Sequence, residues 1–165
     1  MARAPPRPGK PPRESASEIV EQMFPQDANH VGNVLGGKVV HLVDIAGGLA
    51  AMRHASRVVV TARIGEVDFR EPIHVGEFVL ARAKVVFTGA TSLETQVEVF
   101  AENPLTRQRR LTTRASVTYV AIDEQGKPVS VPPLLPETDE ERAAFDEANK
   151  QYEQRKRGAT KRRRA

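Results

Sequence analysis

Residues 29–44 combine two features that could support catalysis. Gly36 and Gly37 open a mainly apolar segment in which Asp44 is the first acidic residue. A helix that starts at these glycines presents free backbone N–H groups, which suit the oxygen of a carbonyl or a phosphate. A carboxylate in apolar surroundings is costly unless it has a use. Asp44 is therefore a candidate general base, and Asn29 is a polar residue shortly before the glycines.

Each of these residues also has a purely structural interpretation. The Gly-Gly pair can be a tight turn before a helix, a lone helical Asp is usually exposed or salt-bridged, and Asn29 is typical of a loop or cap. His41 lies three residues before Asp44, so the two could share one side of a helix, although a packing or solvent-facing histidine is the more common case. The four histidines lack metal-ligand spacing, and no dinucleotide-binding motif is present.

The charge distribution separates a central body from two basic ends. The chain has 165 residues and a net charge of +4, but residues 14–154 hold 14 basic and 21 acidic side chains, a formal charge of −7. Nucleic-acid binding by the body is therefore not expected. The absence of cysteine excludes disulfides and thiolate catalysis. There is no secretory signal and no 18-residue apolar run, so we expect a cytoplasmic protein without a membrane span.

The hydrophobic pattern predicts one long helix followed by an antiparallel sheet. Apolar residues recur at helical spacing over residues 35–54. β-rich runs follow at 57–69, 78–87, 93–100 and 110–122, the last two with strict alternation. Short turns without helices join these runs, which indicates an α+β fold with the helix on one face of the sheet. Residues 15–23 fit either a short helix or an edge strand.

Two further features concern the helix and the ends of the chain. Gly47 and Gly48 interrupt the predicted helix at a cost of about 1 kcal/mol each, which indicates close approach by a strand or a ligand. We expect four segments: a disordered Pro/Arg-rich N-terminus at 1–13, a domain at 14–136, a charged helix at 137–154 and a disordered basic tail at 155–165. Thr138 and Glu141 form a capping-box pattern at the start of that helix.

An ordered set of motifs resembles the hotdog-fold acyl-CoA thioesterases of the short bacterial and cytosolic type. In that fold an antiparallel sheet wraps around one long central helix. The set covers about residues 15–138 and comprises Asn29, Gly32, Gly36-Gly37, Asp44, residues 55–61, Val67-Asp68-Phe69, Pro72-Ile73, Gly76-Glu77, Gly89-x-Thr91-Ser92, residues 120–128 and Val131-Pro132.

The resemblance implies hydrolysis of acyl-CoA thioesters to a carboxylic acid and coenzyme A. Asp44 would be the general base or, less expectedly, a nucleophile, and Asn29 would orient the water or the carbonyl. The N–H groups of Gly36 and Gly37 would stabilise the oxyanion. The family implies that Asn29 and Asp44 act together from opposite protomers of a dimer, assembled into a hexamer as a trimer of dimers. No metal or redox cofactor is expected.

The resemblance also suggests where coenzyme A binds. Gly89, Thr91 and Ser92 would line a pantetheine channel at the dimer interface, which we favour over the alternative of a plain hairpin turn. The phosphates of coenzyme A require Arg or Lys, and the candidates on strands are Arg82, Lys84, Arg110 and Arg114.

Two other functions fit parts of the sequence. A non-catalytic acyl-CoA sensor could use the basic tail to bind nucleic acid, but no helix-turn-helix precedes the body, and the tail lacks the aromatic residues that stack on bases. A hotdog hydratase would need a suitably framed His with an acidic partner, whereas the helix carries Asp44 at that position.

Overall fold

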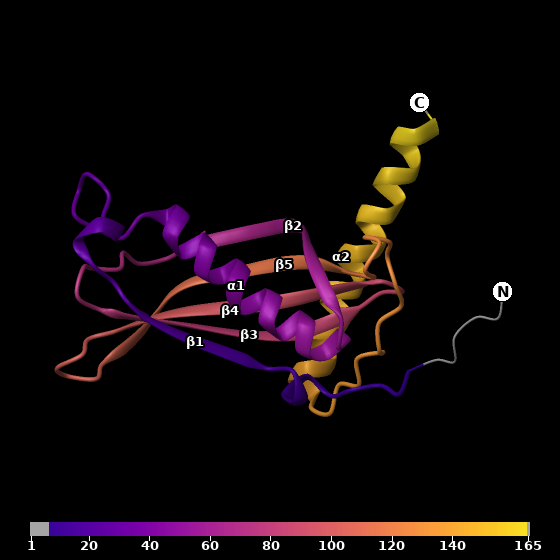
Figure 1. Cartoon of the computed structure of the whole chain (residues 1–165), viewed down its shortest axis with the longest axis horizontal. Helices are drawn as coiled ribbons and strands as arrows, with labels where there is room; N and C mark the ends of the chain where they lie inside the picture. The colour runs from indigo at the N-terminus through magenta and orange to yellow at the C-terminus, as the bar shows by residue number, and fades with distance from the viewer. Residues whose placement is uncertain (1–6, 165) are drawn as a thin grey trace.

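The computed structural model describes residues 7–164, with the side chains of residues 7–158. Five antiparallel strands form one sheet in the order β1-β3-β4-β5-β2, and α1 lies across one face of it (Figure 1). The elements are β1 (Ser17–Gln22), α1 (Gly36–Ala55), β2 (Val58–Phe69), β3 (Phe78–Thr88), β4 (Ser92–Glu102), β5 (Arg109–Ile122) and α2 (Asp139–Arg164), with short 3₁₀ turns at Pro12–Glu14 and Pro25–Asp27. The α+β hotdog prediction is confirmed, and residues 15–23 contain the edge strand β1 rather than a helix.

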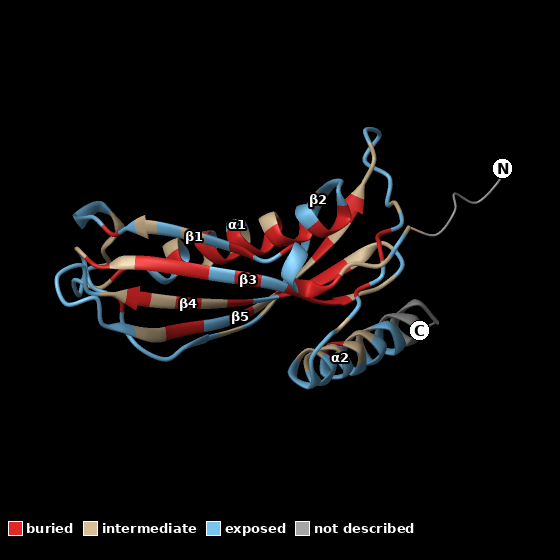
Figure 2. Cartoon of the chain, turned by 90° about the horizontal axis from the view of Figure 1, so that it is seen from below, coloured by how far each residue is buried: buried red, intermediate tan, exposed pale blue. Residues whose placement is uncertain are grey.

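Helix α1 forms where the apolar periodicity predicts it, within one residue of each predicted end. Its sheet-facing side is buried (Figure 2) and includes Val39, Leu42, Val43, Ala46 and Ala50. Ser56 ends the helix in the left-handed conformation, with φ of 49°. The wide apolar face stabilises the helix through tertiary packing, which offsets the poor helix propensity of Gly47 and Gly48.

Strands β4 and β5 alternate as predicted except at Thr112 on β5, which is buried beside Thr113, and at Glu94 on β4. Leu93, Thr95 and Val97 face the core, but Glu94 on the opposite face is also buried. Its carboxylate pairs with Arg155 of α2. The outer face of β4 is therefore only partly open to solvent, because α2 covers it, and this cover was not anticipated from the strand pattern.

Residues 7–13 pack against the domain, whereas the sequence predicted a disordered segment at 1–13. The backbone N–H of Lys10 donates to Pro133 over 2.9 Å, and its carbonyl accepts from Leu135 over 2.9 Å. The Lys10 ammonium donates to the carbonyl of His54 at the end of α1 over 3.0 Å. A proline-rich segment can pack in this way because it loses little conformational entropy on folding and its carbonyl groups can still accept hydrogen bonds. Residues 1–6 of the predicted segment lie outside the described residues.

Helix α2 lies on the sheet face opposite α1 (Figure 2) and is longer than the predicted 137–154. It continues through the segment 155–165 that was predicted to be a disordered tail, of which residue 165 is not described. The predicted capping box is confirmed, since Thr138 Oγ1 accepts from the Glu141 N–H over 3.1 Å. Phe145 and Tyr152 pack on Phe87 of β3. These contacts and the Arg155–Glu94 pair hold the helix past residue 154.

Candidate active site

The Asp44 carboxylate faces the sheet and receives hydrogen bonds from two strands. Thr61 Oγ1 on β2 donates to Asp44 Oδ1 over 2.7 Å, and the Tyr119 hydroxyl on β5 lies 3.2 Å from the same oxygen. Asp44 is half-buried, whereas His41 is exposed, and the carboxylate bonds to Thr61 and Tyr119 rather than to His41. Among the described residues no donor bonds to Oδ2. One carboxylate oxygen is thus fixed, and the other is available to a ligand.

The Gly47-Gly48 pair marks a close approach between β5 and α1. The buried Tyr119 ring lies against both glycines, and its hydroxyl donates to the main-chain carbonyl of Asp44 over 2.7 Å. A Cβ on Gly47 would lie 2.6 Å from the Tyr119 hydroxyl and 2.8 Å from Thr95 Oγ1. The expected close approach is confirmed, and the approaching group is a strand.

Replacing Gly47 with Ala is expected to give a free energy of unfolding about 1–3 kcal/mol lower than replacing Gly158 with Ala, because both changes gain helix propensity but only the methyl group at position 47 overpacks a contact, with Tyr119 and Thr95. Urea denaturation followed by circular dichroism measures this difference. Gly158→Ala is the matched control, since a Cβ there meets no atom within 4 Å. Equal stability of the two variants would show that the helix moves aside at no cost.

Asn29 lies in the loop before α1, and Gly36 and Gly37 are the first two residues of the helix. The Asn29 side-chain oxygen accepts the N–H groups of Val31 and Asn33 over 3.0 and 3.1 Å, so the turn is fixed and the side-chain NH₂ group is left to donate elsewhere. Gly36 and Gly37 are exposed, and Leu35 gives the helix no side-chain cap. A Cβ on Gly37 would meet nothing within 4 Å. Free N–H donors at a positive helix end suit an oxyanion.

The chain therefore carries two candidate half-sites. We call Asn29, Gly36 and Gly37 the N-terminal half-site, and Asp44 with Thr61 and Tyr119 the aspartate half-site. Asp44 follows Gly36 by eight residues, which is about 12 Å of helix rise. An acyl carbonyl bound at the glycines of one chain is thus too far from the carboxylate of the same chain for direct proton transfer.

The predicted coenzyme A residues divide between two places. Gly89, Thr91 and Ser92 form the turn between β3 and β4, where Ser92 pairs with Val120 of β5. Arg82 and Lys84 alternate with the core residues Ala81, Ala83 and Val85, so they project from the face opposite α1.

Arg82 and the remaining arginine candidates are held in ion pairs. Arg82 pairs with Glu18, Arg110 with Glu77 over 2.6 Å, and Arg114 with Glu98 over 3.0 Å. The Glu77 pair lowers the pKa of its carboxyl group, mainly through the hydrogen bond from Arg110. The structure therefore does not gather these cations around Asp44.

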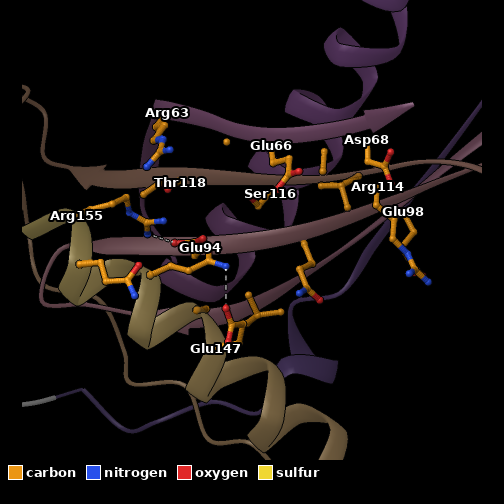
Figure 3. Close-up of a pocket in the computed structure, with 18 of the residues that line it drawn as sticks. Arg63, Glu66, Asp68, Glu94, Glu98, Arg114, Ser116, Thr118, Glu147 and Arg155 are labelled. Atoms are coloured by element: carbon orange, nitrogen blue, oxygen red, sulfur yellow. Dashed lines mark hydrogen bonds and ion pairs between the residues drawn. The ribbon is translucent and has the colours of Figure 1, made fainter. Parts of the chain in front are cut away.

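A polar pocket of about 780 Å³ lies on the outer face between β2, β4, β5 and α2 (Figure 3). Its charged walls are largely paired already: Arg114 with Glu98, and Arg155 with Glu94. It does not include Asp44.

The described side chains contain no group of three or more His, Asp or Glu residues placed to hold a metal ion. No helix within residues 7–164 has the length and apolar character needed to span a bilayer.

Comparison with known proteins identifies the family. Residues 31–108 match the thioesterase superfamily. The chain is 35% identical over 144 residues to YkhA of Bacillus subtilis, named an uncharacterised acyl-CoA thioester hydrolase; the match covers 87% of this chain and 84% of that protein. The chain belongs to the acyl-CoA thioester hydrolases. The resemblance inferred from the ordered motifs is confirmed.

Solved acyl-CoA hydrolases share the whole fold. One from Staphylococcus aureus, in complex with butyryl coenzyme A, coenzyme A and coenzyme A disulfide, has a TM-score of 0.85 and 34% identity, covering 95% of this chain and 96% of that chain. An apo-hexameric acyl-CoA thioesterase has a TM-score of 0.87 and 40% identity, covering 93% of this chain and 98% of that chain.

Three solved variants of the Staphylococcus aureus hydrolase replace an aspartate, an asparagine and a threonine by alanine. In that protein the asparagine precedes the aspartate by 15 positions, and the threonine follows the aspartate by 17. Asn29, Asp44 and Thr61 have the same types and the same spacings.

Sequence reasoning missed Thr61 and Tyr119. Thr61 lay inside a β-rich run, where threonine is common for its shape, and no local signal distinguished it. The Gly47-Gly48 pair was a signal for Tyr119, because two glycines in a packed helix indicate a bulky neighbour. It did not reveal which strand supplies that neighbour.

Proposed function

We propose that this hydrolase cleaves acyl-CoA thioesters to a carboxylic acid and coenzyme A, with Asp44 as the general base. The observation that carries the assignment is the Asp44 carboxylate, whose Oδ1 is held by Thr61 over 2.7 Å and whose Oδ2 has no partner among the described residues. A carboxylate held by one oxygen can accept a proton from water at the other.

In the proposed reaction, water attacks the thioester carbonyl carbon and passes one proton to Asp44 Oδ2. The N–H groups of Gly36 and Gly37 bind the resulting oxyanion, a contribution of about 3–4 kcal/mol for each donor. The side-chain NH₂ group of Asn29 orients the carbonyl or the water. The carbon–sulfur bond then breaks, and the proton on Asp44 passes to the leaving thiolate, which departs as the free thiol of coenzyme A.

We infer that the two half-sites combine across a dimer. Strand β2 is an edge of the sheet, and it exposes Val58, Val60, Ile64 and Phe69. A long unpaired edge with apolar side chains favours pairing with a second copy. Two copies joined about a two-fold axis at β2 would place their α1 helices antiparallel. The N-terminal half-site of one chain would then approach the aspartate half-site of the other.

The oligomeric state is proposed from a structural relative, and the cellular location is proposed from the substrate. A structural relative is a hexameric acyl-CoA thioesterase, and we propose a homohexamer built from such dimers. The substrate, an acyl-CoA, is a metabolite of the cell interior, and we propose a cytoplasmic location. The turn at Gly89, Thr91 and Ser92 remains the proposed pantetheine contact, on the strength of the family resemblance alone. We propose no metal or redox cofactor, because the steps above use only protons and N–H donors.

Thiol release from a series of acyl-CoA substrates tests the function. The wild-type protein is expected to release one thiol for each carboxylic acid formed, without added metal or nucleotide. Binding of acyl-CoA without thiol release would favour a non-catalytic sensor. Hydration of an enoyl-CoA without thiol release would favour a hydratase. Either result would overturn the proposed function.

A further inference from the structure

We propose that Tyr119 is a positioning residue for Asp44, and that its hydroxyl turns the carboxylate so that Oδ2 faces the attacking water. This inference rests on the proposed role of Asp44 as the base. It assigns a supporting role to a residue on β5, which need not contact the substrate.

The geometry ties Tyr119 to both parts of Asp44. Its hydroxyl donates to the Asp44 carbonyl over 2.7 Å and lies 3.2 Å from Oδ1. One O–H group thus bridges the main chain and the side chain of the same residue. This bridge restricts rotation of the carboxylate about its side-chain bonds. A free aspartate would exchange its two oxygens, whereas this one holds Oδ1 toward the sheet.

Thr61 supports the same orientation from the neighbouring strand. Thr61 and Tyr119 are directly paired residues of β2 and β5, so the spacing between their side chains is set by the ladder. Both oxygens lie within hydrogen-bond distance of Asp44 Oδ1, at 2.7 and 3.2 Å. The cross-strand pair therefore forms a rigid cradle for that oxygen.

Tyr119 holds its proton and serves as a donor. Only 1% of its surface is exposed. Burial raises the pKa of the Tyr119 hydroxyl well above its usual value, and the charge and hydrogen bond of Asp44 raise the pKa further. The raised pKa keeps the hydroxyl protonated, so Tyr119 can donate a hydrogen bond to Asp44.

The helix is shaped to admit this ring. A Cβ on Gly48 would lie 3.6 Å from the Tyr119 ring, and one on Gly47 would lie 2.6 Å from its hydroxyl. The glycine pair, unfavourable for a helix by itself, lets the hydroxyl reach the main chain of Asp44. Thr95 Oγ1 also lies beside Gly47. It donates to the carbonyl of Val117 over 3.3 Å and makes no hydrogen bond to Asp44.

Tyr119→Phe tests the inference, because it removes the hydroxyl and keeps the ring. We expect kcat to fall about 10- to 100-fold with KM changed less than about 3-fold, since misplacing a reacting group by about 1 Å costs on that order. The value of kcat is expressed per folded protomer, measured by circular dichroism, so partial unfolding cannot imitate the loss. Tyr152→Phe on α2 and Thr95→Val beneath Gly47 are the controls, and both should keep kcat.

A second comparison separates positioning from general packing. If Tyr119 acts through Asp44, Tyr119→Phe should cause no further loss in an Asp44→Asn background, whereas it should multiply the loss caused by Asn29→Ala. Three results would overturn the inference. They are an unchanged kcat in Tyr119→Phe, a rise in the KM of Tyr119→Phe as large as its fall in kcat, and a fall in kcat in Thr95→Val as large as that in Tyr119→Phe. Full activity of Asp44→Asn would overturn the proposed base itself, so the two failures are distinguishable.

Discussion

Asp44→Asn is expected to lower kcat for thioester hydrolysis by about 10³-fold while preserving the fold, since general-base catalysis contributes on that order. Thr61 donates to Oδ1 over 2.7 Å, so the amide oxygen of the new residue should occupy that place and its NH₂ group should replace Oδ2. An amide nitrogen cannot take a proton from water at neutral pH. Thiol release under single-turnover conditions measures the loss.

The control for this substitution is Asp146→Asn, which changes an exposed carboxylate on α2 to the same amide. It should keep wild-type turnover. Both variants should show the wild-type thermal transition, because the amide oxygen introduced by Asp44→Asn can still accept from Thr61 and Tyr119. Turnover by Asp44→Asn within a few-fold of wild type would contradict the assignment of the base.

Mixing two inactive variants is expected to restore activity. Asp44→Asn and Asn29→Ala, refolded together in equal amounts, should reach about a quarter of wild-type turnover, because random pairing places an intact Asp44 opposite an intact Asn29 in that share of sites. The reason is the helix rise of about 12 Å between Gly36 and Asp44 of one chain. The fraction does not depend on whether the dimers assemble further.

The reciprocal mixture provides the control. Wild type refolded with the double variant Asn29→Ala/Asp44→Asn should give about a quarter of full turnover for a site shared between protomers, and about a half for a site within one protomer. Each single variant refolded alone gives the baseline. A first mixture that stays at this baseline would contradict the composite site.

The sequence predicted the parts of the molecule that depend on local periodicity. The span of α1 and the strands from 57 to 122 follow from apolar spacing, and the structure places each within a few residues of its predicted bounds. Asp44 and Gly36 could be singled out because a carboxylate and a glycine pair are unusual in such a helix. The ordered motifs then indicated the hotdog family, which the comparisons confirm.

The features that the sequence did not predict depend on contacts between residues far apart in the chain. The bond from Thr61 to Asp44 exists only because β2 lies beside α1, and the pairing of Thr61 with Tyr119 is set by the β2–β5 register. Arg155 was assigned to a disordered tail because the composition of residues 155–164 is typical of disorder. Its pairing with the buried Glu94 on β4 could be known only once α2 was seen to cover that strand.

Because the glycines and the carboxylate lie far apart on α1, the activity of this enzyme should depend on the protomer concentration. In the proposed dimer a lone chain contains both halves of the machinery and yet has no working site. At protomer concentrations well below the dissociation constant, the amount of active enzyme therefore rises with the square of the concentration. Specific activity should fall on dilution and recover on concentration, so the population of assembled chains sets the rate.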